Sequence, residues 1–464
     1  MSRVTHSVAM TSQLDEQLRG HLLQTRSQED LCFVLWSPSK GASRQTALLR
    51  HFIAPTAGDR ALHGNASFTG QYFDRVIAEA LKVGCGIAFL HSHLGPGWQG
   101  MSHDDVVAEQ RLAPSALGAT GLPLVGLTLG TGGSWSARFW ERVTGRQYER
   151  KWCGTVRVVG DDMRVTYMDE LAPPPRFREQ LTRTVSAWGA NKQSLLARLH
   201  VGVVGAGSVG AICAEGLART GFENVTAIDF DKVELVNLDR LLHATVDDVG
   251  KLKVDLLRAV LPRHATAEGF DLHPVVAAVY EEAGFRAALD CDALIACVDW
   301  PWGRSVLNFI AYAHLIPVVD GGIIVRVNKS GDMRGADWRA HVAAPGRRCL
   351  ECLGQYSPAD VSLEREGFLD DPEYIRGLPK DHHLRRNENV FAFSVNAAGM
   401  QLMQLISMVV SPAGIGNPGA QIYHVVPGSL DIERKHGCQP LCPYSGLIGC
   451  GDMAGLSVTG QRKA

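Results

Sequence analysis

The segment 200–221 reads HVGVVGAGSVGAICAEGLARTG, and its order decides the fold of the second half of the chain. An apolar strand-like run leads into a glycine turn, and the turn leads into a helix-like stretch. Gly205, Gly207 and Gly210 form the pattern G-x-G-x-x-G, which lets backbone amides approach phosphate groups at a helix N-terminus. Taken alone, this pattern is compatible with any dinucleotide-binding dehydrogenase.

The segments that follow continue the alternation of strands and helices. Residues 225–231 (VTAIDFD) and 293–299 (ALIACVD) are expected as strands, and residues 251–261 as a helix. Such alternation predicts parallel strands with right-handed crossovers, which is a doubly wound α/β sheet. From about residue 330 onward the sequence is richer in loops. The apolar stretch 391–410 has polar interruptions and is expected to be a packed core helix rather than a membrane span.

Polar side chains gather on and just after the predicted strand ends. They are Asp229, Asp231, Asn237, Arg240, Lys251, Lys253 and Asp299. Cations could offset the charge that develops at an attacked phosphate, and a strand-end aspartate could hold a ribose hydroxyl. The set therefore favours a triphosphate with magnesium over a nicotinamide cofactor. A Rossmann domain that binds NAD is the alternative.

This series resembles the ubiquitin-activating superfamily of ThiF and MoeB, which adenylates the C-terminal glycine of ubiquitin-like proteins. The resemblance covers residues 178–330 closely. It implies that Asn237, Arg240 and Lys253 grip the triphosphate, that Asp299 binds magnesium and that Asp229 holds the ribose, with Asp231 beside it.

The resemblance also implies an arginine from the helical lead-in at 176–199, often supplied by the partner protomer. Arg183 fits best by its distance from Trp188, and Arg178 is the alternative. Trp300 stands where many relatives carry asparagine, which leaves the pocket next to Asp299 open to variation.

Two close cysteine pairs suggest a second metal site. Cys349 and Cys352 form a CxxC, and Cys438 and Cys442 lie near the C-terminus. Four thiolates can close a tetrahedral structural zinc site, and ThiF and MoeB relatives carry one. The second pair has three intervening residues instead of the usual two. A redox-active CxxC is the alternative, although no thioredoxin-like context accompanies it.

No cysteine lies between Cys352 and Cys438, where related enzymes that form a thioester carry one. Adenylation without an obligatory internal thioester is therefore expected. Cys349 or Cys352 acting as the nucleophile is the alternative. The polar segment 355–390 is expected to be loop-like and suited to gripping a partner's tail.

A different constellation marks the first half of the chain. His91-Ser92-His93 follows the apolar run GIAFL, and Ser102-His103-Asp104-Asp105 comes a short loop later. Residues two apart on a strand share a face, so His91 and His93 can hold one ion, and Asp105 can add a carboxylate oxygen. Two imidazoles and one carboxylate with an open fourth position describe a catalytic zinc site.

This pattern resembles the JAMM (MPN-plus) metalloproteases, which hydrolyse bonds next to ubiquitin-like proteins. It implies that His91, His93 and Asp105 bind zinc, that Glu29 before LCFVLW is the general base and that Ser102 hydrogen-bonds the oxyanion. Leu94 replaces the usual proline, and the loop to Ser102 is one residue longer. The alternative is that Ser102 and Asp105 only cap a helix.

Length and composition set the remaining expectations. A chain of 464 residues suggests two or three domains: a JAMM-like domain at 10–170, a linker and lead-in at 171–200 and a ThiF-like domain at 201–464. Net charge is only −2, the 11 cysteines are scattered, and the N-terminus lacks an apolar signal core. A cytoplasmic protein that binds neither nucleic acid nor membrane is expected.

Together these patterns predict an α/β fusion enzyme that acts on a ubiquitin-like or sulfur-carrier protein with a C-terminal glycine. Its cofactors would be a catalytic zinc, a structural zinc, ATP and magnesium. A homodimer is expected from the resemblance, and a conjugating enzyme is a possible partner. A non-catalytic scaffold that binds the modifier and an NAD-dependent oxidoreductase are the alternatives.

Overall fold

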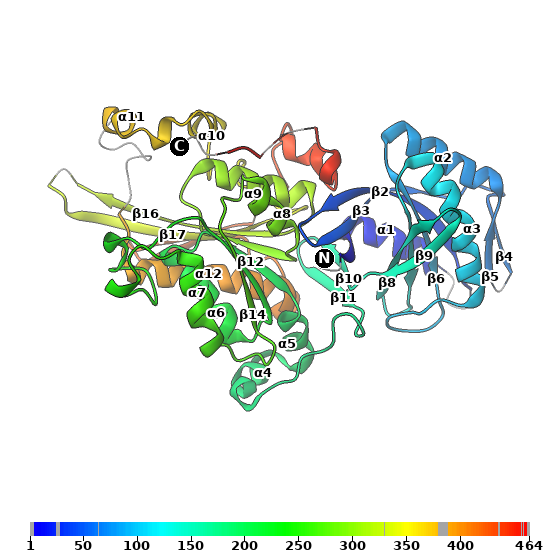
Figure 1. Ribbon diagram of the computed structural model, residues 1–464, viewed down its shortest axis with the longest axis horizontal. Helices are drawn as coiled ribbons and strands as arrows, with labels where there is room; N and C mark the ends of the chain where they lie inside the picture. The colour runs from blue at the N-terminus through cyan, green and yellow to red at the C-terminus, as the bar shows by residue number, and fades with distance from the viewer. Residues whose placement is uncertain are drawn as a thin grey trace. The chain divides into compact units, whose positions relative to one another are not determined.

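A computed structural model describes residues 4–24, 28–63, 65–328, 330–378, 388–434, 437–455, 457 and 459–461 (Figure 1). The chain divides into two compact units. The N-terminal unit comprises Met1–Pro173 with Ala313–Leu315 and Leu447–Ala454. The C-terminal unit comprises Pro174–Tyr312, Ile316–Gly446 and Gly455–Ala464.

The N-terminal unit is built on a nine-stranded mixed sheet with the order β11-β10-β1-β3-β2-β6-β7-β8-β9. Its strands are β1 (Thr5–Thr11), β2 (Leu31–Lys40), β3 (Arg44–Ile53), β6 (Gly86–Ser92), β7 (Leu124–Leu129), β8 (Trp135–Thr144), β9 (Gln147–Trp152), β10 (Thr155–Val159) and β11 (Met163–Tyr167). A small hairpin, β4 (Arg60–His63) and β5 (Asn65–Phe68), lies apart from this sheet.

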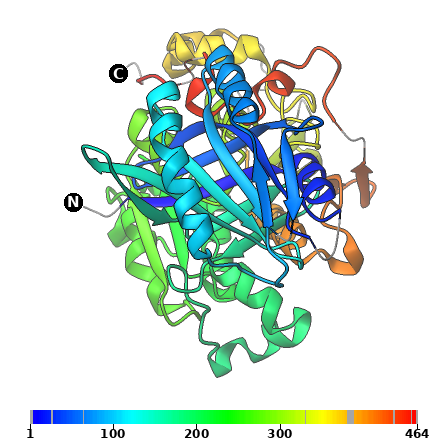
Figure 2. The same cartoon turned by 90° about the vertical axis from the view of Figure 1, so that its right-hand side faces the viewer.

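Helices cover both faces of this sheet, and the alternation of side chains on β2 shows why. Cys32, Val34 and Trp36 point into one core, which includes side chains of α1 (Ser12–Leu22). The alternate residues of β2 point into a second core with α2 (Gly70–Val83) and α3 (His103–Thr120). Figure 2 looks onto the face that carries α2 and α3. Burial on both sides explains why LCFVLW is apolar throughout.

The apolar runs LCFVLW and GIAFL lie in β2 and β6, but some other strands carry no such run. β1 begins at Thr5, before the expected domain start at residue 10, and pairs with β3 and β10 in the sheet interior. β9 is an edge strand with the sequence QYERKW. An edge strand needs no continuous apolar run, and its charged residues discourage pairing with other chains.

The C-terminal unit contains an eight-stranded sheet with the order β14-β13-β12-β15-β16-β17-β18-β19. Its strands are β12 (His200–Val204), β13 (Asn224–Ile228), β14 (Asp271–Val275), β15 (Ala293–Ala296), β16 (Val318–Val327), β17 (Met333–Ala343), β18 (Ala420–His424) and β19 (Ser429–Glu433). The first five strands of this order are parallel, and the remaining pairs are antiparallel. The expected Rossmann-like α/β fold is confirmed.

Helices lie on both faces of the parallel part. Figure 1 shows α6 (Ser208–Thr220) and α7 (Lys253–Val260) on one face, and α8 (Glu282–Leu289) and α9 (Pro301–Ala313) on the other. The strand order reverses between β12 and β15, whose carboxyl ends lie next to each other. Ligands of doubly wound sheets bind at this point.

The helix α12 (Phe391–Val410) is long and apolar enough to cross a membrane by length and composition, but it packs inside the C-terminal unit. It contacts α6, β16 and β17. Its buried Gln401 donates to the carbonyls of Ala296 and Val319. These polar contacts to two strands are those of a core helix, as expected from the polar interruptions in its sequence.

Beyond residue 330, β17, β18 and β19 extend the sheet with strands that the sequence did not predict. Two expectations about the C-terminal unit need correction. The lead-in helix is broken at Gly189, whose φ of 86° separates α4 (Thr182–Trp188) from α5 (Ala190–Ala197). The segment 355–390 contains α10 (Pro358–Arg365) and α11 (Pro372–Gly377), while residues 379–387 lie outside the described part.

Candidate functional site

The three glycines of the loop after β12 differ in why the loop contains glycine at each position. Gly205 has a φ of 91°, and an added Cβ would lie 2.4 Å from the carbonyl oxygen of Cys297. At Gly210 a Cβ would lie 1.8 Å from the carbonyl oxygen of Gly205. A Cβ at Gly207 would meet no described atom within 4 Å, so the protein itself does not require glycine there. Open space beside an uncapped helix N-terminus suits the close approach of a phosphate group.

Asp229, directly after β13, organises the loop beside this helix. Its carboxylate accepts hydrogen bonds of 2.6 Å from the amides of Ala206 and Asp231. Burial raises the pKa of Asp229, and the nearby Lys253 charge opposes this shift only in part. The amide of Ala206 links the aspartate to the glycine loop. One turn could therefore contact both the ribose and the phosphate groups of a nucleotide.

The predicted phosphate-binding residues Lys253, Asn237 and Arg240 lie in two neighbouring parts of the segment that follows Asp229. Lys253, the first residue of α7, donates to Asp231 at 2.9 Å, and its side chain is only 12% exposed. Asn237 ends the 3-10 helix η2 (Leu235–Asn237), and its side chain accepts from the amide of Glu234. Arg240 donates to the carbonyl of Val236 and to Asp239. The structure thus brings Lys253 to Asp229 and Asp231 and sets Arg240 one turn after Asn237.

The remaining predicted ATP-site residues are less tightly held. Asp299 is exposed and follows β15 at the carboxyl edge of the sheet, where it could bind magnesium. Arg183 is exposed on α4, and the alternative Arg178 precedes the 3-10 helix η1 (Glu179–Leu181). The geometry within one chain does not favour either arginine.

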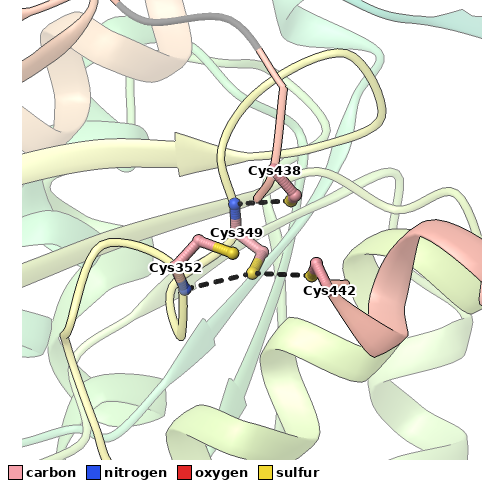
Figure 3. A group of neighbouring side chains, drawn as sticks. All are labelled: Cys349, Cys352, Cys438 and Cys442. Carbon is pink, nitrogen blue, oxygen red and sulfur yellow. Dashed lines mark hydrogen bonds between the residues drawn. The ribbon is translucent and has the colours of Figure 1, made fainter. Parts of the chain in front are cut away.

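The four predicted cysteines meet in one cluster (Figure 3). The Sγ atoms of Cys349 and Cys442 are 3.6 Å apart. Tetrahedral zinc with bonds of about 2.3 Å separates its sulfur ligands by roughly 3.8 Å, so this spacing fits. Backbone amides of Cys349 and Cys352 donate to sulfur, as does the amide of Gln439. Hydrogen bonds with Cys349 lower the pKa of Cys438 to about 5, which favours a thiolate.

His91, His93 and Asp105 also converge. The Nε2 atoms of the two histidines are 3.2 Å apart, and the Asp105 oxygens lie 3.2 Å from His93 and 3.3 Å from His91. Zinc with nitrogen and oxygen ligands at about 2.0–2.1 Å requires ligand atoms about 3.3 Å apart in a tetrahedron. The donor set and its spacing therefore fit zinc. One departure is that the buried Nδ1 of His91 has no hydrogen-bond partner in the described structure.

The chain positions these ligands through a strand end and a helix start. His91 lies on β6 opposite Leu31, so Glu29 comes just before the pairing of β2 with β6. A hydrogen bond with Asp105 raises the pKa of His93, and the charge of Glu29 adds to this shift. Ser102 caps α3: its hydroxyl accepts from the amide of Asp105, and its own amide donates back to that carboxylate. Ser102 and Asp105 therefore do cap the helix, while the Ser102 hydroxyl can still donate its proton.

Residues 178–417, more than half of the chain, match the ThiF family model. The chain belongs to the ThiF family. The domain that carries the glycine loop, Asp229 and Lys253 is therefore a ThiF domain with a Rossmann-like α/β fold.

Curated relatives match parts of this domain. The chain is 34% identical over 152 residues to tRNA threonylcarbamoyladenosine dehydratase of Escherichia coli, covering 32% of this chain and 54% of that protein. It is 29% identical over 163 residues to the molybdopterin-synthase adenylyltransferase of E. coli, covering 34% and 62%. It is 28% identical over 203 residues to the NEDD8-activating enzyme E1 catalytic subunit of Arabidopsis thaliana, covering 40% and 42%. The chain thus spans about half the length of these relatives.

A solved structure of E. coli MccB with AMPCPP and MccA is 17% identical, with a TM-score of 0.44, and covers 57% of this chain and 73% of that one.

The glycines of the ThiF domain give a matched pair of predictions. Gly207→Ala fits the space around it, so stability should change by less than ~0.5 kcal/mol while the KM for ATP rises about tenfold. Gly210→Ala places a methyl group against a carbonyl and should cost ~3 kcal/mol or more. Thermal unfolding and pyrophosphate exchange measure the two effects. Equal effects of both variants on stability and KM would contradict this assignment of roles.

The cysteine cluster predicts a structural effect. Cys349→Ala should release about one zinc ion per chain and lower the free energy of unfolding by several kcal/mol, because three thiolates hold zinc poorly. Metal analysis and thermal unfolding measure this change, with Cys291→Ala as a buried cysteine outside the cluster. If Cys349→Ala retained its zinc but no longer formed an adduct that hydroxylamine cleaves, Cys349 would instead be a nucleophile.

Two buried charge networks support these sites, and sequence reasoning missed both. Asp320, fully buried, pairs with Arg304 at 2.9 Å and with Arg339. Arg304 also donates to the carbonyl of Val298, next to Asp299, and so holds that strand end in place. An arginine in the first turn of an apolar helix, PWGRSVL, was the available signal.

The second network lies behind the histidines. Arg138 on β8 pairs with Glu109 of α3 and donates to Thr128 at 2.6 Å, while Thr128 contacts His91 at 3.3 Å. Arg138 and Glu109 are both fully buried. The arginine within the apolar run WSARFW was the sequence signal.

Proposed function

We propose that the ThiF domain uses ATP and magnesium to adenylate a carboxylate at the C-terminal glycine of a ubiquitin-like or sulfur-carrier protein. One observation carries this proposal. The open glycine loop, Asp229 and Asp299 follow β12, β13 and β15 at the point where the strand order reverses, and Lys253 pairs with Asp231 near Asp229. The names of two relatives, a molybdopterin-synthase adenylyltransferase and a NEDD8-activating enzyme subunit, agree with it.

The residues would divide the work as follows. A carboxylate oxygen of the carrier protein attacks the α-phosphorus of ATP, and the bond to the β-phosphate oxygen breaks to release pyrophosphate. Lys253, Arg240 and Asn237 bind the phosphate oxygens and offset their charge in the transition state. Asp229 accepts from the ribose. Asp299 would hold magnesium, which neutralises the departing pyrophosphate when bound. Arg183 of the same or a partner subunit would add a further cation.

We further propose that the N-terminal unit is a JAMM-type zinc metallopeptidase. His91, His93 and Asp105 would hold zinc, which supplies Lewis acidity for the activation of water. Glu29 accepts a proton from the attacking water and delivers it to the leaving amine. Ser102 donates a hydrogen bond to the oxyanion. The convergence of two imidazoles and one carboxylate, whose two oxygens lie 3.3 Å from His91 and 3.2 Å from His93, supports this assignment.

The two activities would meet on one substrate. A peptidase joined to a glycine-activating domain would have as its target the C-terminal tail of the carrier protein that the ThiF domain adenylates. The first unit would trim a precursor to expose the terminal glycine, or release the modifier from its conjugates. A cytoplasmic homodimer that passes its product to a conjugating enzyme or to sulfur transfer is the cellular setting that we propose.

A second candidate substrate is a modified tRNA. Two bacterial relatives are named tRNA threonylcarbamoyladenosine dehydratase, and the E. coli protein is 34% identical over the matched residues. Threonylcarbamoyladenosine carries a carboxylate from its threonyl group, so the same adenylation chemistry could act on it.

Pyrophosphate exchange separates these candidates. The full chain, ATP, magnesium and labelled pyrophosphate are incubated with ubiquitin-like proteins that end in glycine, with sulfur carriers or with threonylcarbamoylated tRNA. We expect exchange only when a protein ending in glycine is present. Exchange with the modified tRNA alone would show that the substrate is RNA rather than a carrier protein. A thermal shift with NAD but none with ATP and magnesium would contradict adenylation by any route.

A further inference from the structure

A third group of metal-ligand side chains lies in the ThiF domain, apart from the residues assigned above. Glu215 comes from α6, His243 from the segment after η2, and His264 follows the 3-10 helix η4 (Leu261–Arg263). One carboxylate oxygen of Glu215 lies 3.1 Å from Nε2 of His243 and 2.9 Å from Nδ1 of His264. All three ligand atoms lie within 4.8 Å of one another.

The cluster is shielded, yet one side of it reaches solvent. The side chains of Glu215, His243 and His264 are 12%, 14% and 29% exposed. Arg219, one turn further along α6, binds the other carboxylate oxygen of Glu215. This contact holds the carboxylate so that its other oxygen faces both imidazole rings. Hydrogen-bond partners of metal ligands orient those ligands in the same way.

The backbone at His243 is held in an unfavourable conformation. Its φ is 73°, in the left-handed region that residues other than glycine uncommonly adopt, with asparagine, aspartate and histidine the most frequent exceptions. Such a conformation costs on the order of 1 kcal/mol and persists only where surrounding contacts impose it. Here it directs the imidazole toward Glu215 and the ring of His264, whose centroid lies 5.1 Å away.

We propose that Glu215, His243 and His264 bind a zinc ion through one carboxylate oxygen, Nε2 and Nδ1, with a solvent molecule completing the tetrahedron. Two imidazoles and a carboxylate form a donor set that zinc favours. The two short edges of the ligand triangle, 2.9 and 3.1 Å, need to open by only a few tenths of an ångström to match the ~3.3 Å spacing of tetrahedral zinc.

The site would tie together three separate segments of the domain. His243 lies in the segment that carries Asn237 and Arg240, and the amide of Leu241 donates to the carbonyl of Asn237 at 2.8 Å. Zinc would therefore anchor this segment to α6 and to the end of η4. If Asn237 and Arg240 grip ATP, a consequence that rests on the proposed function, zinc would also hold the triphosphate-binding turn in place.

Zinc content of the full-length protein tests the site. Glu215→Gln and His243→Gly are each expected to lose about one zinc per chain relative to the wild type and to lose the rise in melting temperature that added zinc produces. Glycine is chosen at His243 because it tolerates the positive φ, so the backbone need not change. His273→Asn removes an exposed histidine on β14 of the same domain and should retain all zinc.

Zinc content equal to the wild type in both Glu215→Gln and His243→Gly would overturn the site. The KM for ATP gives a second readout, and a several-fold increase in both variants is expected. An unchanged KM together with lost zinc would overturn only the link to the triphosphate. Zinc content is measured without turnover, so failure of the adenylation proposal would leave the result on the metal site intact.

Discussion

Lys253→Ala is expected to lower pyrophosphate exchange by about 10²–10³-fold while leaving the fold unchanged. Lys253 begins α7, is only 12% exposed and stands beside Asp231 and Asp229 at the edge of the glycine loop. A fixed cation in this shielded position stabilises charge that develops on the phosphates far better than water does. Its removal also deprives Asp231 of its partner, which should have a small effect because Asp231 is half exposed.

Lys251→Ala is the matched control. Lys251 lies two residues earlier in the same segment, is 58% exposed and pairs with Asp248. It should retain nearly full exchange, because a solvated lysine contributes little to a phosphate site. Similar losses in both variants would show that the effect comes from the net charge of the segment rather than from a specific phosphate contact.

Glu29→Gln is expected to lower hydrolysis of a modifier–peptide bond by about 10²–10⁴-fold. An amide of the same shape cannot accept the proton of the attacking water. Glu29 is placed for this role because it precedes β2, which pairs with β6 at His91, and because its charge raises the pKa of His93. The ligands His91, His93 and Asp105 are untouched, so zinc content should stay at the wild-type level.

The control for this prediction is Glu79→Gln on α2. Glu79 is 46% exposed, pairs with Lys82 and belongs to the same unit. Hydrolysis should be unaffected by this change. If Glu29→Gln kept full activity, or lost activity only in step with zinc, Glu29 would not be the general base.

The sequence allowed the doubly wound fold and the neighbourhood of the glycine loop to be predicted, because both depend on local patterns. The G-x-G-x-x-G turn, the strand-end Asp229 and the paired cysteines follow from spacing along the chain. The four-cysteine cluster and the cluster of His91, His93 and Asp105 could be predicted for the same reason. His91 lies on β6 and His93 directly follows its last residue, Ser92, while the members of each cysteine pair are close in sequence.

The missed features depend on contacts between distant segments. Arg138 and Glu109 are 29 residues apart, and the sequence does not show that they pair when β8 and α3 pack together. Glu215, His243 and His264 likewise come from three segments with no common spacing. The edge strand β9 escaped because it lacks an apolar run. The spacing of apolar residues in the sequence indicates which face of a helix or strand is buried. It does not indicate which helices and strands pack against each other, and the missed features depend on that packing.

The measurement closest to the central claim is pyrophosphate exchange with two forms of one carrier protein. One form ends in glycine, and the other carries a short peptide after that glycine. The wild-type chain should support exchange with both forms, since we propose that its N-terminal unit exposes the glycine that its ThiF domain adenylates. Glu29→Gln should support exchange only with the mature form. Equal exchange by Glu29→Gln with both forms, or no exchange by the wild type with the mature form, would contradict the account.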